Sequence, residues 1–192
     1  MRRQRSVALL FLGAALSLFG QVDAGVSAAR TVGVVDFYAP SQLGAYGIMP
    51  ERFAANDLSM LLTQAAVGQF TVVSRASIER AEASLGWQTV DALRFDRLRA
   101  LAQALGADTL IVGQISLLVN LDGGRTPPNA SADANLVLQV FDAAQGRFAA
   151  EVRQSGSVVA GLQRDLLTEQ VLHDALVRAV PALDAALVAR SP

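Results

Sequence analysis

One short apolar segment near the N-terminus constrains the fold most. Residues 31–37, TVGVVDF, are rich in β-branched side chains and are apolar at both alternating sets of positions. A strand of this kind is typically covered on both faces of its sheet, because neither set of side chains favours water. An amphipathic helix pattern follows it from Pro50. The segment therefore predicts a central strand of an α/β sandwich.

Residues 70–73 form a second short strand after this helix, and helix signals continue from there. Ser74 is suited to cap a helix, which the segment 86–89 then interrupts. Another helix is expected from about Asp91, with Phe95 on its buried face. Gly106 should end that helix and Asp108 should fix the following turn, so we interpret these residues as a structural joint and not as a binding site.

Three strands and a helix complete the pattern. Residues 109–119 and 134–141 have strand composition, and the linker 120–133 between them is rich in glycine and proline. Residues 142–146 form a hairpin turn before a returning strand. A last helix is expected at 162–188, where Pro181 should introduce a kink or begin a second helix. The order β-α-β-α-α-β-β-β-α predicts a single α/β domain over residues 31–190, with a mixed five-stranded sheet flanked by helices.

The first residues have the layout of a signal peptide. A basic start is followed by an apolar stretch at 7–20 and by the small residues Val22 and Ala24, so cleavage is expected before Gly25 or, alternatively, after Ala28. Removing residues 1–24 takes three of 16 basic and one of 17 acidic side chains, which leaves a formal charge of −3 and argues against nucleic acid binding. The chain has no cysteine, so we expect no disulfide and no lipid anchor attached through an N-terminal cysteine. We expect a periplasmic or secreted protein without a membrane span.

Residues for catalysis are scarce. His173, the one histidine, lies beside an apolar helix face and is expected to be a core-margin residue with one hydrogen-bond partner. A metal cluster built on histidine or cysteine is excluded by composition, and no cofactor motif is present. The alternative to a non-catalytic protein is a small-molecule-binding or hydrolytic enzyme that pairs Asp36 with Asp108 or Asp142 at strand ends; otherwise these aspartates cap helices or turns.

Large side chains in segments expected at the surface are the candidates for partner contact. Tyr38, Tyr46 and Met49 belong to a loop rich in glycine and proline, and Trp87 lies in a helix break. Arg125 lies in the 120–133 tip. The alternative is that the aromatic residues cover the ends of the core.

In the order of its motifs the sequence resembles the CsgG-like family. That family includes the curli secretion channel and relatives that activate peptidoglycan synthases. The resemblance covers residues 31–157 and rests on three motifs in order: Val72-Val73-Ser74-Arg75, Gly106-Ala107-Asp108 with Gly113, and Asp142 to Gly146. It implies an exported, non-enzymatic protein that acts through protein contacts and often forms rings. It also makes Tyr46 a counterpart of constriction residues in the channel.

Two departures from the family limit what the resemblance implies. The lipid-anchoring cysteine and the long inserted hairpins are missing, so the chain is not expected to form a channel itself. The sequence thus predicts an envelope accessory protein that assembles with itself or with an envelope complex, for secretion or cell-wall assembly.

Overall fold

The computed structural model describes residues 29–39, 49–65, 69–120, 130–159 and 164–189. The predicted signal peptide, Tyr46 and Arg125 lie outside the described residues.

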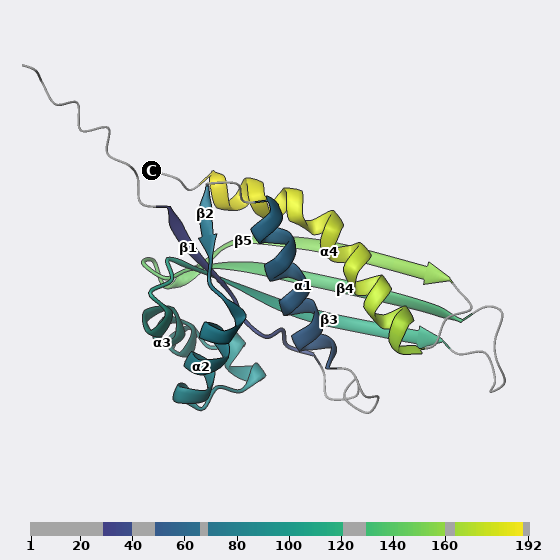
Figure 1. Cartoon of the computed structure of the whole chain (residues 1–192), viewed down its shortest axis with the longest axis horizontal. Coiled ribbons are helices and arrows are strands. Elements are labelled where there is room, and N and C mark those ends of the chain that lie inside the picture. The colour runs from purple at the N-terminus through teal and green to yellow at the C-terminus, as the bar shows by residue number, and fades with distance from the viewer. Residues whose placement is uncertain (1–28, 40–48, 66–68, 121–129, 160–163, 190–192) are drawn as a thin grey trace, which may run out of the picture.

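A five-stranded sheet in the order β2-β1-β3-β4-β5 runs through the molecule (Figure 1). β1 pairs in parallel with β2 and β3, whereas β3, β4 and β5 form antiparallel pairs, so the predicted mixed sheet is confirmed. β1 is buried at its end, as its composition predicts, but β3 takes the central position. The strands are β1 Arg30–Val34, β2 Phe70–Val72, β3 Thr109–Asn120, β4 Ser131–Asp142 and β5 Arg147–Val159.

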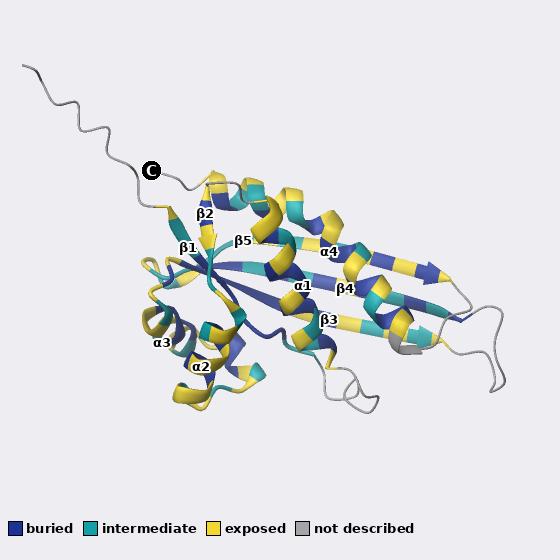
Figure 2. Cartoon of the chain, in the orientation of Figure 1, coloured by how far each residue is buried: buried dark blue, intermediate teal, exposed yellow. Residues whose placement is uncertain are grey.

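Helices cover both faces of the sheet, though unequally. α1 (Pro50–Ala65) and α4 (Arg164–Val188) pack on one face and enclose the larger core. α2 (Arg75–Leu85) and α3 (Phe95–Leu105) pack on the other face over a smaller core. The ribbon of β3, β4 and β5 extends beyond α2 and α3, and Figure 2 shows exposed residues along these strands. Part of one sheet face is therefore without a covering helix in the described structure.

The segment from Gly106 to Asp108 is a structural joint, as predicted. Gly106 ends α3 in the left-handed conformation, with φ of 60°. The Asp108 carboxylate then accepts a hydrogen bond of 2.8 Å from the main-chain N–H of Thr31, which ties the start of β3 to β1. The local glycine signal was sufficient to find this joint because only glycine adopts that conformation without strain.

Replacing Gly106 by alanine should lower the free energy of unfolding by about 1 kcal/mol, because a Cβ strains the left-handed conformation. No neighbouring atom lies within 4 Å of such a Cβ, so the loss of stability reports backbone strain alone and no steric clash. Gly106→Asn should lower the free energy of unfolding by less, since asparagine tolerates this conformation. Urea denaturation compares the variants, and an alanine variant as stable as wild type would contradict the assignment.

Several predicted boundaries are wrong. The helix expected from about Asp91 is present as α3, but it begins only at Phe95, and Thr89–Leu93 forms a separate 3₁₀ turn. Phe95 is predicted on the buried face, but it is 53% exposed. It starts α3 at the margin of the sheet, where the centre of its ring lies 5.3 Å from that of Phe148. Pro181 does not begin a second helix, since α4 continues through it to Val188.

The predicted 120–133 linker is also too long. Asn120 pairs with Ser131, so both ends of that segment belong to the β3–β4 hairpin. Cross-strand pairing, which periodicity in one strand cannot reveal, extends β4 to Ser131.

Candidate functional site

A pocket lies at the carboxyl end of β1. It has a volume of about 270 Å³, and its lining includes Asp36, Arg52, Glu79, Glu82, Trp87 and Thr89. We call it the β1-end pocket. The chain leaves β1 for α1 on one face of the sheet and leaves β2 for α2 on the other. Ligands of α/β proteins commonly bind where connections diverge in this way, so the pocket is a candidate binding site.

Asp36, which lines the pocket, forms an ion pair with Arg75. The Arg75 guanidinium donates to the Asp36 carboxylate and, over 2.8 Å, to the main-chain oxygen of Val34. The two side chains are only 17% and 12% exposed. Arg52 approaches the second oxygen of Asp36 to 3.7 Å from α1 and is half exposed. The charge of Asp36 is therefore compensated inside the protein, mainly by Arg75.

Glu82 is the chemically unusual residue of the pocket. It is 9% exposed, and its Oε1 atom is buried without a hydrogen-bond partner in the described structure. Burial, followed by the charge of Asp36, raises the pKa of Glu82 from 4.5 to about 7. The charge of Arg75, a main-chain hydrogen bond from Asp36 and the charge of Arg52 oppose this rise. Near neutral pH this carboxyl is therefore present in both protonation states.

The raised pKa makes folding stability depend on pH. Between about pH 4.5 and 7 the folded state holds a proton on Glu82 that the unfolded state has released, so the free energy of unfolding should fall as pH rises through this window. Glu82→Gln should flatten this slope and stabilise the protein at pH 8 by about 1 to 2 kcal/mol. Urea denaturation at several pH values measures both effects. Glu79→Gln, an exposed change on the same helix, is the matched control, and an equal slope in wild type and Glu82→Gln would contradict the assignment.

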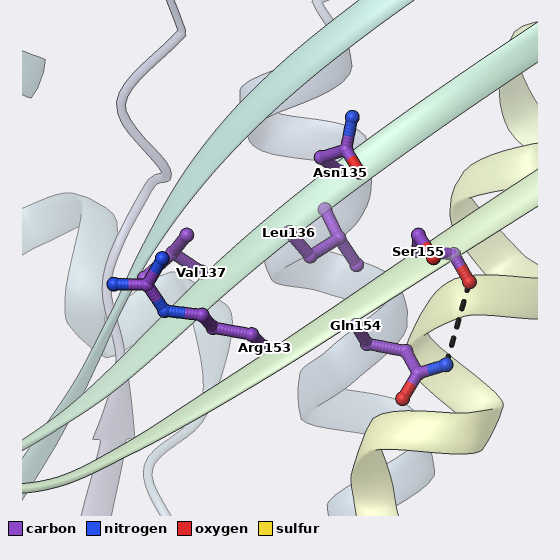
Figure 3. Close-up of a pocket in the computed structure, with 6 residues that line it drawn as sticks. All are labelled: Asn135, Leu136, Val137, Arg153, Gln154 and Ser155. Atoms are coloured by element: carbon purple, nitrogen blue, oxygen red, sulfur yellow. Dashed lines mark hydrogen bonds between the residues drawn. The ribbon is translucent and has the colours of Figure 1, made fainter.

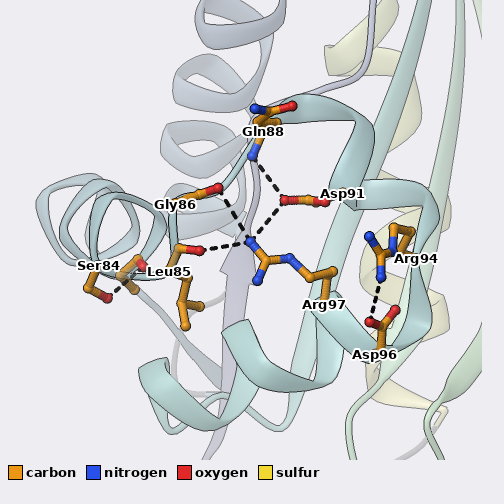
Figure 4. A network of polar contacts seen from close by, with 9 residues as sticks. Ser84, Leu85, Gly86, Gln88, Asp91, Arg94, Asp96 and Arg97 are labelled. Atoms are coloured by element: carbon orange, nitrogen blue, oxygen red, sulfur yellow. Dashed lines mark hydrogen bonds and ion pairs between the residues drawn. The ribbon is translucent and has the colours of Figure 1, made fainter.

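A polar network fixes the segment that carries Trp87 (Figure 4). Arg97 donates to the main-chain oxygen of Leu85 over 2.8 Å and to Asp91 over 3.0 Å. Asp91 also accepts from the Gln88 N–H, and although burial opposes its charge, these donors hold the pKa of Asp91 below its usual value. The Arg97 guanidinium lies 5.9 Å from the centre of the Trp87 ring. Trp87 is thus held in place, yet its buried Nε1 atom has no partner among the described residues.

The predicted contact residues are separated in the structure. Trp87 borders the β1-end pocket. Tyr38 is half-buried, and its main chain bonds to Gly113 and Ile115 of β3. Met49 is 60% exposed before α1. Their role in partner contact stays a prediction.

The catalytic pairing considered from sequence is wrong. Asp108 bonds to Thr31 at the start of β1, whereas Asp36 follows the end of that strand. Asp142 lies opposite Thr109 and accepts from the Gln145 N–H in the hairpin turn. Asp108 and Asp142 therefore act at turns, which was the alternative interpretation, and the carboxyl beside Asp36 is Glu82.

His173 has the structural role expected from its helix face. Its Nδ1 atom lies 2.8 Å from the buried carboxylate of Asp57, which joins α4 to α1. In the part of the chain that the structure describes, no group of histidine and acidic residues could hold a metal ion.

Sequence reasoning missed Glu82, although a signal exists. Glu82 lies four residues after Ile78 and three before Leu85, inside the apolar stripe of α2. An acidic residue in such a stripe indicates a buried polar site. For Arg75 the sequence offers only its place in the Val72-Val73-Ser74-Arg75 motif.

A second candidate surface is the uncovered part of the β3–β5 face, which we call the open sheet face. Its rows follow the strand register, and its residues are Gln114, Ser116 and Leu118 of β3, Asp133, Asn135 and Val137 of β4, and Arg153, Ser155 and Ser157 of β5. A hollow of about 350 Å³ lies around Asn135, Val137, Arg153 and Ser155 (Figure 3). Leu118 is 58% exposed. The surface combines amide, hydroxyl and aliphatic groups with two opposite charges.

Solved structures share this fold at low sequence identity. Lipoprotein GNA1162 from Neisseria meningitidis is 14% identical with a TM-score of 0.55, covering 81% of this chain and 98% of that protein. Hypothetical protein CT253 from Chlamydia trachomatis is 12% identical with a TM-score of 0.55, covering 85% and 100%. The C-terminal domain of LpoB from Salmonella enterica is 21% identical, covering 70% of this chain and 86% of that one, with a TM-score of 0.42.

No family model matches the sequence, and no curated protein matches it. None of the described helices is both long and apolar enough to cross a membrane.

Proposed function

We propose that the protein is an exported, non-catalytic accessory protein of the bacterial cell envelope that acts through protein contacts. It associates with itself or with an envelope complex, in secretion or in cell-wall assembly. The signal-peptide pattern of residues 1–24, the order of CsgG-like motifs and a fold shared with a lipoprotein support this proposal.

The open sheet face is the observation that carries the proposal. Side chains at alternate positions of β3, β4 and β5 pack against α1 and α4, so the intervening ones point away from that core. Asp133 and Arg153 are the charged members of this face. Low charge combined with exposed aliphatic groups is typical of the centre of a protein interface.

Light scattering and chemical cross-linking test the proposal together. We expect an oligomer at tens of micromolar or a discrete cross-linked adduct in the cell envelope. Asn135→Arg, which places a bulky charge at the centre of the open sheet face, should abolish either species. Gln103→Arg, an exposed change on α3, should leave it intact. A monomer without any envelope adduct would refute the proposal.

A further inference from the structure

The β1-end pocket contains a buried carboxyl group, that of Glu82, with an oxygen that lacks a hydrogen-bond donor in the described structure. Glu82 of α2 lines the pocket and is about nine-tenths buried, and the oxygen without a donor is its Oε1 atom. A buried acceptor without a partner costs about 1 to 3 kcal/mol, and a charged one costs more. A donor from outside the chain would remove this cost.

The charges around Glu82 indicate which kind of external hydrogen-bond donor the pocket favours. Asp36, after β1, is compensated by Arg75 from the start of α2, so this pair adds no net charge to the site. Glu79 on α2 adds a negative charge, and Arg52 from α1 adds a positive charge that lies half exposed at 3.7 Å from Asp36. With Glu82 ionised, the described groups leave one net negative charge, which favours a cation.

We propose that the β1-end pocket binds an ammonium or guanidinium group, supplied either by a basic side chain of a partner protein or by a free amine. The cation donates to Glu82 and forms a charge-assisted hydrogen bond, which is stronger than a bond between neutral groups. This inference does not depend on the proposed envelope function, because it concerns a different surface.

Trp87 distinguishes the two sources of the cation. Trp87 borders the same pocket, and its indole N–H is buried without an acceptor in the described structure. A basic residue within a peptide brings a main-chain carbonyl that can accept from this N–H, whereas a simple guanidinium ion carries donors and no acceptor. Peptide-bound arginine should therefore bind more tightly than the free cation if a partner protein is the source.

The chain has one tryptophan, so its single indole N–H resonance reports directly on the site. Protein purified from cells that express the whole chain is titrated with N-acetyl-arginine methylamide, with ethylguanidinium and with the neutral isostere N-acetyl-citrulline methylamide. We expect both cations to move the Trp87 resonance saturably. The citrulline ligand should bind at least about tenfold more weakly, a difference that corresponds to 1.4 kcal/mol.

Variants and pH complete the test. Glu82→Gln should weaken cation binding at least about tenfold, and Glu79→Gln should weaken it less. Binding should strengthen as pH rises towards 7, because the cation requires ionised Glu82. Equal binding of the arginine and citrulline ligands, absence of any saturable shift, or full affinity in a folded Glu82→Gln variant would each overturn the proposal. Tighter binding of the peptide form assigns the site to a partner's basic residue, and equal binding of the two cations assigns it to a free amine.

Discussion

Gly113→Ala should lower the free energy of unfolding by about 3 kcal/mol, at the upper end of the cost of overpacking a core. A Cβ at this position would lie 2.4 Å from the ring of Phe37, which is fully buried. The ring sits directly on the main chain of β3, and the Tyr38 N–H bonds to the Gly113 oxygen over 2.7 Å. The segment after β1 is therefore locked to β3 and cannot move aside to admit a methyl group. Urea denaturation measures the loss.

Two variants identify the cause of this loss. Gly33→Ala places a Cβ 2.9 Å from the flexible end of Leu110, so it should cost about 1 kcal/mol because a side chain can move. Phe37→Leu combined with Gly113→Ala should be less destabilised than the sum of the single changes, since the smaller side chain makes room. Strict additivity would show that the Phe37 contact is not the reason that glycine is needed.

Arg75→Ala should lower the free energy of unfolding by about 3 kcal/mol, because it leaves the buried Asp36 carboxylate without its main partner. The Val34 oxygen loses its donor as well. Arg52 remains near Asp36, but at 3.7 Å it replaces only part of the interaction. The loss is measured by urea denaturation at neutral pH.

A double-mutant cycle tests the ion pair directly. Asp36→Asn in the Arg75→Ala background should recover much of the lost stability, since a neutral amide is cheaper to bury than an unpaired carboxylate. Arg80→Ala on the same helix is the control, because its bonds are local and exposed, and should cost about 0.5 kcal/mol or less. If Arg75→Ala resembles Arg80→Ala, the pair does not stabilise the fold.

Local signals account for the parts of the fold that sequence predicts correctly. Ser74 caps α2 by accepting from the Ser77 N–H, and Gly86 and Gly106 end helices with positive φ. Each of these depends on a few neighbouring residues, so one sequence is enough to recognise it. The apolar run at 31–37 likewise reports burial on two faces.

What sequence could not predict depends on tertiary pairing. The hairpin register extends β4 to Ser131. The position of α3 leaves Phe95 largely exposed, with its ring beside that of Phe148. The β1-end pocket joins residues from the end of β1, from α1 and from α2, which are brought together only by the crossover of the chain. Sequence reasoning identified Asp36 but chose the wrong partner, because strand polarity places Asp108 and Asp142 at the opposite end of β1.

Photo-cross-linking in intact cells tests whether the open sheet face is a protein contact surface. A photoreactive residue is placed at Asn135, within the face, or at Gln103 on the exposed side of α3. We expect a discrete adduct, with a second copy or an envelope protein, from position 135 and none from position 103. Absence of an adduct at 135, or the same adducts from both positions, would contradict it.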